Sequence, residues 1–126
     1  MNAPNLARDD RGATIVEFAL VAPLLIMIVV GGINLSMLGF SAANLRSATE
    51  AAARCAAVNT GTCSSASATQ AYAASRMTHL TSARASFTGP LSEACGKKVS
   101  GSLSFVVQTG LREFTVPLAA SACFPQ

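Results

Sequence analysis

Four cysteines carry the clearest covalent chemistry in this sequence: Cys55, Cys63, Cys95 and Cys123. All four follow a long apolar segment, and an even number of cysteines in a short exported region indicates disulfide bonds. Of the three possible pairings we favour Cys55–Cys63, which would bracket a turn, and Cys95–Cys123, which would join the start and end of a predicted hairpin. Zinc sites use closely spaced ligand pairs such as C-x2-C, and the wide spacings here disfavour zinc.

Catalysis finds little support in the other side chains. The one histidine, His79, has no partner acid that its spacing identifies. The acids beyond the first twelve residues form no recognisable acid/base set: Glu17, Glu50, Glu93 and Glu113. The sequence also contains no phosphate-binding loop or nucleophile signature. We therefore predict no catalytic residue, no cofactor and no metal site, and an enzyme that uses His79 is the least favoured of three functions.

An uncharged apolar segment dominates the first third of the chain. No Asp, Glu, Lys or Arg occurs from Phe18 to Leu45, whereas a helix needs only about 20 apolar residues to cross a bilayer. Glu17 stands at the start of this segment, where a carboxylate is costly and usually functional. The alternative role for Glu17 is an interfacial carboxylate that faces headgroups or water. Pro23 is expected either to kink the membrane helix or to be tolerated in it.

A short polar leader, residues 1–12, precedes the apolar segment and ends in Gly12. Arg8 and Arg11 favour a cytoplasmic N-terminus, although Arg46 and Arg54 beyond the segment weaken this preference. A polar leader, a glycine at the cut and an anchor helix with an acid near its start are typical of a prepilin-type signal.

A conventional secretory signal is the alternative for the same residues. It would be cut after a small-residue site such as Ser41-Ala42-Ala43. Its apolar core would be only about 7–15 residues long, however, and Glu17 does not fit such a core.

The amino-acid composition is consistent with a small membrane-anchored protein. The chain has 126 residues, enough for one modest domain, and only 12% of them are charged, about half the usual share. The net charge of +3 is spread thinly, and Lys97-Lys98 is only a pair. Because Trp is absent and Tyr occurs once, an aromatic stacking surface is also disfavoured. We therefore expect no nucleic-acid partner.

Two helices are predicted from hydrophobic spacing and capping residues. The first runs from about Ala13 to about Val58, and its part beyond the membrane carries a stripe at helical spacing: Leu45, Ala48, Ala52 and Cys55. Ser64-Ser65 can cap a second helix that ends at about Leu80.

Strands are predicted where the period changes to two. Alternation predicts strands over 99–107 and 114–122, joined by a turn over 108–113, and a third strand over 84–88 before Gly89-Pro90. Pro117 cannot donate to a ladder, so its strand is expected at an edge or at a bulge. The fold class is therefore α+β: a long N-terminal transmembrane helix, pilin-like, that extends into a small domain with a second helix and an antiparallel hairpin or three-stranded sheet.

The segment RGATIVEFALVAPLLIMIVVGG, which starts at Arg11, resembles the start of TadE-like proteins. These are minor pilins or pseudopilins of the tight-adherence (Flp-type) type IVb pilus system, in which a prepilin peptidase cuts after the Gly. The resemblance implies that Gly12 precedes the cut, that Ala13 becomes the N-terminus and that Glu17 becomes the fifth mature residue. Phe18 occupies the position where the major Flp pilin usually has Tyr. The C-terminal region is larger than that of the major Flp pilin, which is little more than the helix, and this difference favours a minor pilin.

The resemblance also implies an organisation and a set of partners. The expected segments are a leader (1–12), a transmembrane helix (13–40) and a periplasmic α+β domain (41–126) whose helix continues to about 58. The implied function is pilus assembly and surface adhesion, including biofilm formation, from the bacterial inner membrane. The implied partners are other pilins and minor pilins, the prepilin peptidase, the inner-membrane Tad assembly platform and the lipid bilayer. The alternative function is an unrelated single-pass anchored periplasmic binding or adhesion module.

Overall fold

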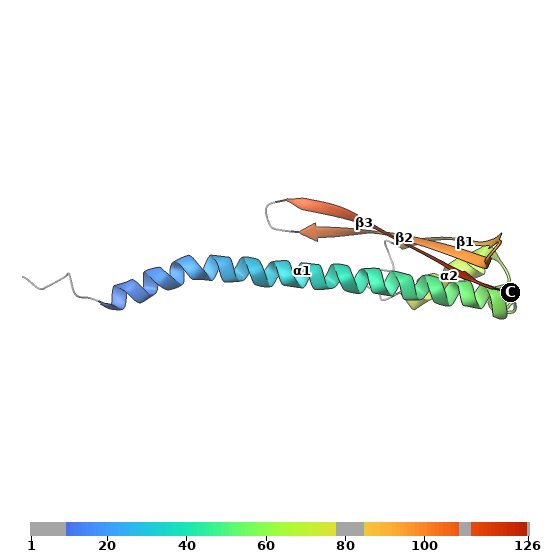
Figure 1. Cartoon of the computed structure of the whole chain (residues 1–126), viewed down its shortest axis with the longest axis horizontal. Coiled ribbons are helices and arrows are strands. Elements are labelled where there is room, and N and C mark those ends of the chain that lie inside the picture. Colours follow the sequence, from blue (N-terminus) through green and yellow to red (C-terminus); the bar gives the residue numbers. More distant parts are fainter. Residues whose placement is uncertain (1–9, 78–84, 109–111, 126) are drawn as a thin grey trace, which may run out of the picture.

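A long helix carries a small three-stranded domain near its C-terminal end (Figure 1). The computed structural model describes residues 10–77, 85–108 and 112–125. The elements, in order, are α1 (Asp10–Val58), α2 (Ala66–Arg76), β1 (Ala85–Glu93), β2 (Gly96–Gln108) and β3 (Glu113–Phe124). The predicted α+β class, with a long apolar helix, a second helix and a three-stranded antiparallel sheet, is confirmed.

Helix α1 has two parts that differ in what covers them. It passes through Pro23 as one element, and the first buried side chain of its described residues is that of Ser41. From there Leu45, Ala48 and Ala52 of the predicted stripe share a core with the sheet, and Leu45 is 1% exposed and Ala52 fully buried. Cys55, the last residue of the stripe, packs in a smaller cluster with Cys63 and Tyr72. The buried Thr49 hydroxyl donates to the Leu45 carbonyl over 2.7 Å, so no polar atom is left without a partner there.

Helix α2 begins where the sequence indicated and ends earlier. The Ser65 hydroxyl accepts a hydrogen bond from the Ala68 N–H over 3.1 Å, which is the N-cap arrangement expected for serine. The helix ends at Arg76 rather than near Leu80, because Met77 adopts an extended conformation and its side chain is buried in the core. Leu80 itself lies outside the described residues.

The strands form an antiparallel sheet in the order β1-β2-β3. Pro117 lies in the edge strand β3 opposite Ser104, in an uninterrupted register, as one of the two predicted options requires. Strand β1 is longer than predicted and runs past Gly89-Pro90 to Glu93. The register shifts between Thr88 and Leu91, so the proline falls where the ladder is already interrupted. Arg84 lies outside the described residues.

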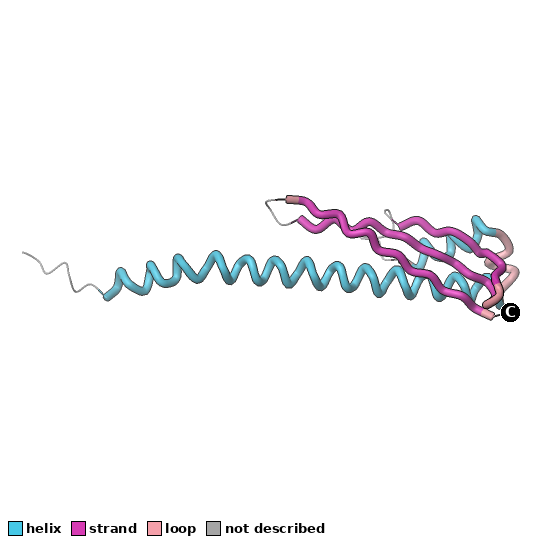
Figure 2. Tube along the Cα trace, turned by 45° about the horizontal axis from the view of Figure 1, so that its top comes forward, coloured by secondary structure: helices cyan, strands magenta, loops and turns pink. Residues whose placement is uncertain are grey.

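The core lies between the sheet and the two helices, and Gly101 of β2 is a point of close approach within it. A Cβ atom on Gly101 would lie 2.9 Å from the Phe87 ring and 2.9 Å from the Thr49 hydroxyl oxygen. Alanines on α1 and a glycine on β2 therefore allow the helix and the sheet to approach closely. Figure 2 shows the strands running beside the C-terminal half of α1.

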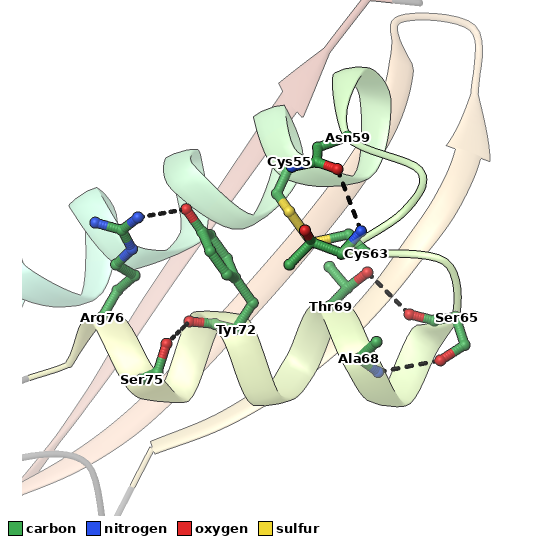
Figure 3. The surroundings of a disulfide bond; sticks show 10 residues. Cys55, Asn59, Cys63, Ser65, Ala68, Thr69, Tyr72, Ser75 and Arg76 are labelled. Atoms are coloured by element: carbon green, nitrogen blue, oxygen red, sulfur yellow. Dashed lines mark hydrogen bonds between the residues drawn. A yellow bond between two sulfur atoms is a disulfide. The ribbon is translucent and has the colours of Figure 1, made fainter.

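Both predicted disulfides are present. Cys55–Cys63 closes the loop between α1 and α2, and Cys95–Cys123 joins the β1–β2 turn to the end of β3. Figure 3 shows Tyr72 between the first disulfide and Arg76. The Arg76 guanidinium donates to the Tyr72 hydroxyl over 2.6 Å and lies 4.9 Å from the ring centroid. The first bond thus fastens the two helices to each other, and the second fastens the sheet.

Candidate membrane anchor and subunit-contact site

The N-terminal half of α1 is an apolar rod that the rest of the chain leaves almost uncovered. A part of α1 starting at Thr14 is long and apolar enough to cross a membrane, and none of its most apolar stretch is buried. Its large apolar side chains are between 42% (Val30) and 75% (Leu20) exposed. A soluble monomer rarely exposes such a continuous apolar surface, so lipid or other protein must cover it.

Gly12 lies in the first turns of α1, in an exposed position. A Cβ atom added to Gly12 would meet nothing within 4 Å. The backbone also has no positive φ there, because the positive-φ glycines are Gly89 and Gly96. The fold of the described residues therefore does not require glycine at this position. Ala13 follows in the same helix.

Glu17 is exposed on α1, one helical turn after Ala13, so the two residues lie on the same face of the helix. Within the described part of the chain, Glu17 makes no ion pair. The neighbouring Phe18 is 74% exposed. The arrangement places a carboxylate and an aromatic ring on an uncovered apolar rod, where both are accessible to a neighbouring molecule.

A groove that the sequence did not predict separates the middle of α1 from the far end of the β2–β3 hairpin. It has a volume of about 430 Å³, and its lining residues are Ile26, Met27, Val30, Gly31, Asn34, Leu35, Leu38 and Val107. Asn34 is the one amide in this lining, and its Nδ2 donates to the Val30 carbonyl over 2.9 Å. The sequence signal that could have located the groove is Asn34, the first strongly polar side chain after Glu17.

The other candidate chemistry is not assembled by the described residues. His79 lies outside the described residues. In residues 10–77, 85–108 and 112–125, no group of three or more His, Cys, Asp or Glu side chains could hold a metal ion. All four cysteines are in disulfides.

The segment that matches a known family lies within α1. Residues 12–54 match the family model described as TadE-like protein. This segment is TadE-like. Its match begins at Gly12, contains Glu17 and Phe18, and ends just before the first cysteine. No curated protein and no solved structure matched the chain.

Over residues 12–54, the match confirms the resemblance seen in the sequence. The TadE-like segment contains the bare apolar rod from Gly12 onward and, of the buried stripe, Leu45, Ala48 and Ala52.

Proposed function

We propose that this protein is a minor pilin or pseudopilin of a Tad (Flp-type) type IVb pilus, anchored in the bacterial inner membrane by α1. The observation that carries the proposal is the division of one TadE-like helix into a bare apolar part and a part that packs under a disulfide-bonded domain. Such a subunit can wait in lipid and later exchange lipid for the helices of other subunits. Surface adhesion and biofilm formation follow from the assembled pilus.

The domain that follows residue 40 lies in the periplasm in this proposal. Two disulfides support this location, because such bonds persist in oxidising compartments outside the cytoplasm. Arg8 and Arg11 before the apolar rod support a cytoplasmic leader.

A prepilin peptidase removes residues 1–12 in this proposal and leaves Ala13 as the N-terminus. Gly12 supports this step, since nothing in the described fold requires a glycine there. A side chain at Gly12 would then matter to the peptidase and not to folding.

Glu17 pairs with the new α-amino group of Ala13 of a neighbouring subunit once the apolar rods pack together. Its exposure and its lack of an ion pair within the described part of the chain support this role. In a bundle of low dielectric constant, such a pair fixes the register of the helices more than it adds net stability.

An anchor exchange separates a pilin from the alternative, an unrelated anchored binding or adhesion module. A strain that lacks the protein is complemented with the full chain, or with a chain in which residues 18–38 are replaced by a Leu-Ala membrane helix of equal length. A pilin needs its own rod for packing, so we expect the exchanged chain to be inserted but piliation to stay lost. Full piliation in the strain that lacks the protein would favour the anchored module, and full piliation restored by the foreign helix would show that the rod does not pack in the pilus.

A further inference from the structure

We infer that the far end of the β2–β3 hairpin rests in the outer interfacial layer of the membrane and that lipid fills the groove between the hairpin and α1. The occupant is the glycerol and upper acyl region of the bilayer lipids. The inference rests on the proposed membrane anchoring and goes beyond it, because it makes the hairpin a second membrane contact.

The hairpin carries an apolar strip on the face turned toward α1. The strip consists of three directly opposed cross-strand pairs, Leu103 with Leu118, Phe105 with Val116 and Val107 with Phe114. Leu103 is 4% exposed, whereas Phe114 is 53% exposed. The strip thus begins in the core, and its side chains become more exposed toward the far end of the hairpin.

Helix α1 presents a matching strip. Its buried stripe at Leu45 and Ser41 continues toward the N-terminus, at steps of one helical turn, as Leu38, Asn34 and Val30. The groove is therefore the open continuation of the interface between α1 and the sheet. Figure 1 shows the hairpin lying beside the middle of α1 and ending well short of its N-terminal end.

The position of the groove along α1 identifies what fills it. About 20 residues of helix, at about 1.5 Å each, cross the hydrocarbon layer, and Ala13 to Gly32 supplies that length. Asn34 and Ser36 follow directly. The hydrocarbon layer therefore ends within the length of the groove, whose α1 lining runs from Ile26 to Leu38, and the groove opens onto lipid at the outer boundary.

The outer edge of β3 keeps the hairpin out of the deeper hydrocarbon. In the described sheet β3 is an edge strand, and its pairing with β2 continues to Gln108 opposite Glu113. Unpaired strand edges are not tolerated in hydrocarbon, but the hydrated interface satisfies them. The charged residues Arg112 and Glu113, at the start of β3, also keep this end of the hairpin out of the hydrocarbon, because charged side chains are costly there.

This placement shortens the membrane span expected from the sequence. The span becomes about 13–33, and residues 34–40 lie in the outer interfacial layer beneath the hairpin. An apolar strip with hydrated flanks fits this layer, because interfacial segments bury one apolar face only part of the way into the bilayer. Two contacts in place of one would then fix the depth and the rotation of the subunit.

Single tryptophans test the inference, since the chain has none of its own. The full chain, in vesicles of phosphatidylethanolamine and phosphatidylglycerol, carries one tryptophan at a time: F114W reports the hairpin, L24W reports the anchor and L91W is the control. Leu91 is an exposed apolar residue of the same sheet, 58% exposed, on β1. Lipids spin-labelled near the headgroup or near the acyl end serve as quenchers, and disulfide mapping verifies each variant.

We expect F114W to be quenched several-fold more by the shallow label than by the deep label, L24W to be quenched mainly by the deep label, and L91W by neither. Quenched L24W with unquenched F114W would overturn the inference and leave the anchoring intact. Unquenched L24W would overturn the anchoring itself. Quenching of F114W that falls as the protein-to-lipid ratio rises would show that a second copy covers the groove, and would also overturn the lipid assignment.

Discussion

Asn34 of α1 and Val107 of β2 line one groove, although the first belongs to the apolar rod and the second to the sheet of the packed domain. The domain therefore does not sit only beyond the rod but also overlaps it. Anchor and domain thus share a boundary region, and the outer edge of the bilayer lies there in the proposed membrane placement.

Replacement of Glu17 by glutamine should reduce pilus assembly without loss of the protein. The change keeps the size of the side chain and removes its charge, and it leaves the α-amino group of a neighbour uncompensated in an apolar bundle. Such one-sided losses cost about 3–5 kcal/mol. Co-purification with other pilins and counts of pili per cell measure the effect.

Glu50→Gln is the matched control, because Glu50 is an exposed acid of the same helix beyond the rod, paired with Arg46 over 3.3 Å. Loss of the Glu50 charge should change neither the co-purification with other pilins nor the number of pili per cell. Normal piliation in Glu17→Gln cells would show that Glu17 only faces the interface, and disappearance of the protein would assign the carboxylate to insertion or stability.

The two disulfides should differ in their contribution to stability. Cys55–Cys63 spans 8 positions and Cys95–Cys123 spans 28. The chain-entropy model makes the longer loop about 1 kcal/mol more stabilising, within a typical range of about 2–4 kcal/mol for each bond. Denaturant unfolding of the two double Cys→Ser variants in detergent measures the difference. Equal loss of unfolding free energy in both variants would contradict the entropic explanation.

Gly101→Ala should destabilise the domain by about 1–3 kcal/mol, the usual cost of overpacking a core. Its new methyl group would lie 2.9 Å from both the Phe87 ring and the Thr49 hydroxyl oxygen. At Gly61 the nearest atom to a new Cβ is 3.6 Å away, so Gly61→Ala is the control and should stay within about 0.5 kcal/mol. A neutral Gly101→Ala variant would mean that α1 and the sheet are less closely packed than described.

Local patterns predicted most of the fold. The stripe from Leu45 to Cys55 and the alternation of serine with apolar residues on β2 have periods that only a helix and a strand, respectively, can place on one face. The predicted end of α2, near Leu80, was wrong. The helix ends at Arg76, where Met77 turns into the core, and no helix-stop residue in the sequence marks this position. The length of β1 was wrong because a register shift accommodates Pro90, which the sequence had placed beyond the strand.

The candidate site was predictable to a different extent. Gly12, Ala13, Glu17 and Phe18 were chosen from a local motif, and their roles stay predictions. The groove was not predicted, because it depends on how far the hairpin extends beside α1. That distance follows from the position along α1 at which β2 packs. Local periodicity in the sequence does not give this position.

The mass of the chain purified from its native cells shows whether residues 1–12 are removed. If α1 is a prepilin-type anchor, the wild-type chain begins at Ala13, and Gly12→Trp keeps residues 1–12 because a bulky side chain replaces hydrogen at the cut. The same two disulfides should form in Gly12→Trp, since nothing lies within 4 Å of a Cβ at that position. A wild-type chain that retains residues 1–12, or a Gly12→Trp chain that still begins at Ala13, would rule out prepilin-type cleavage after Gly12.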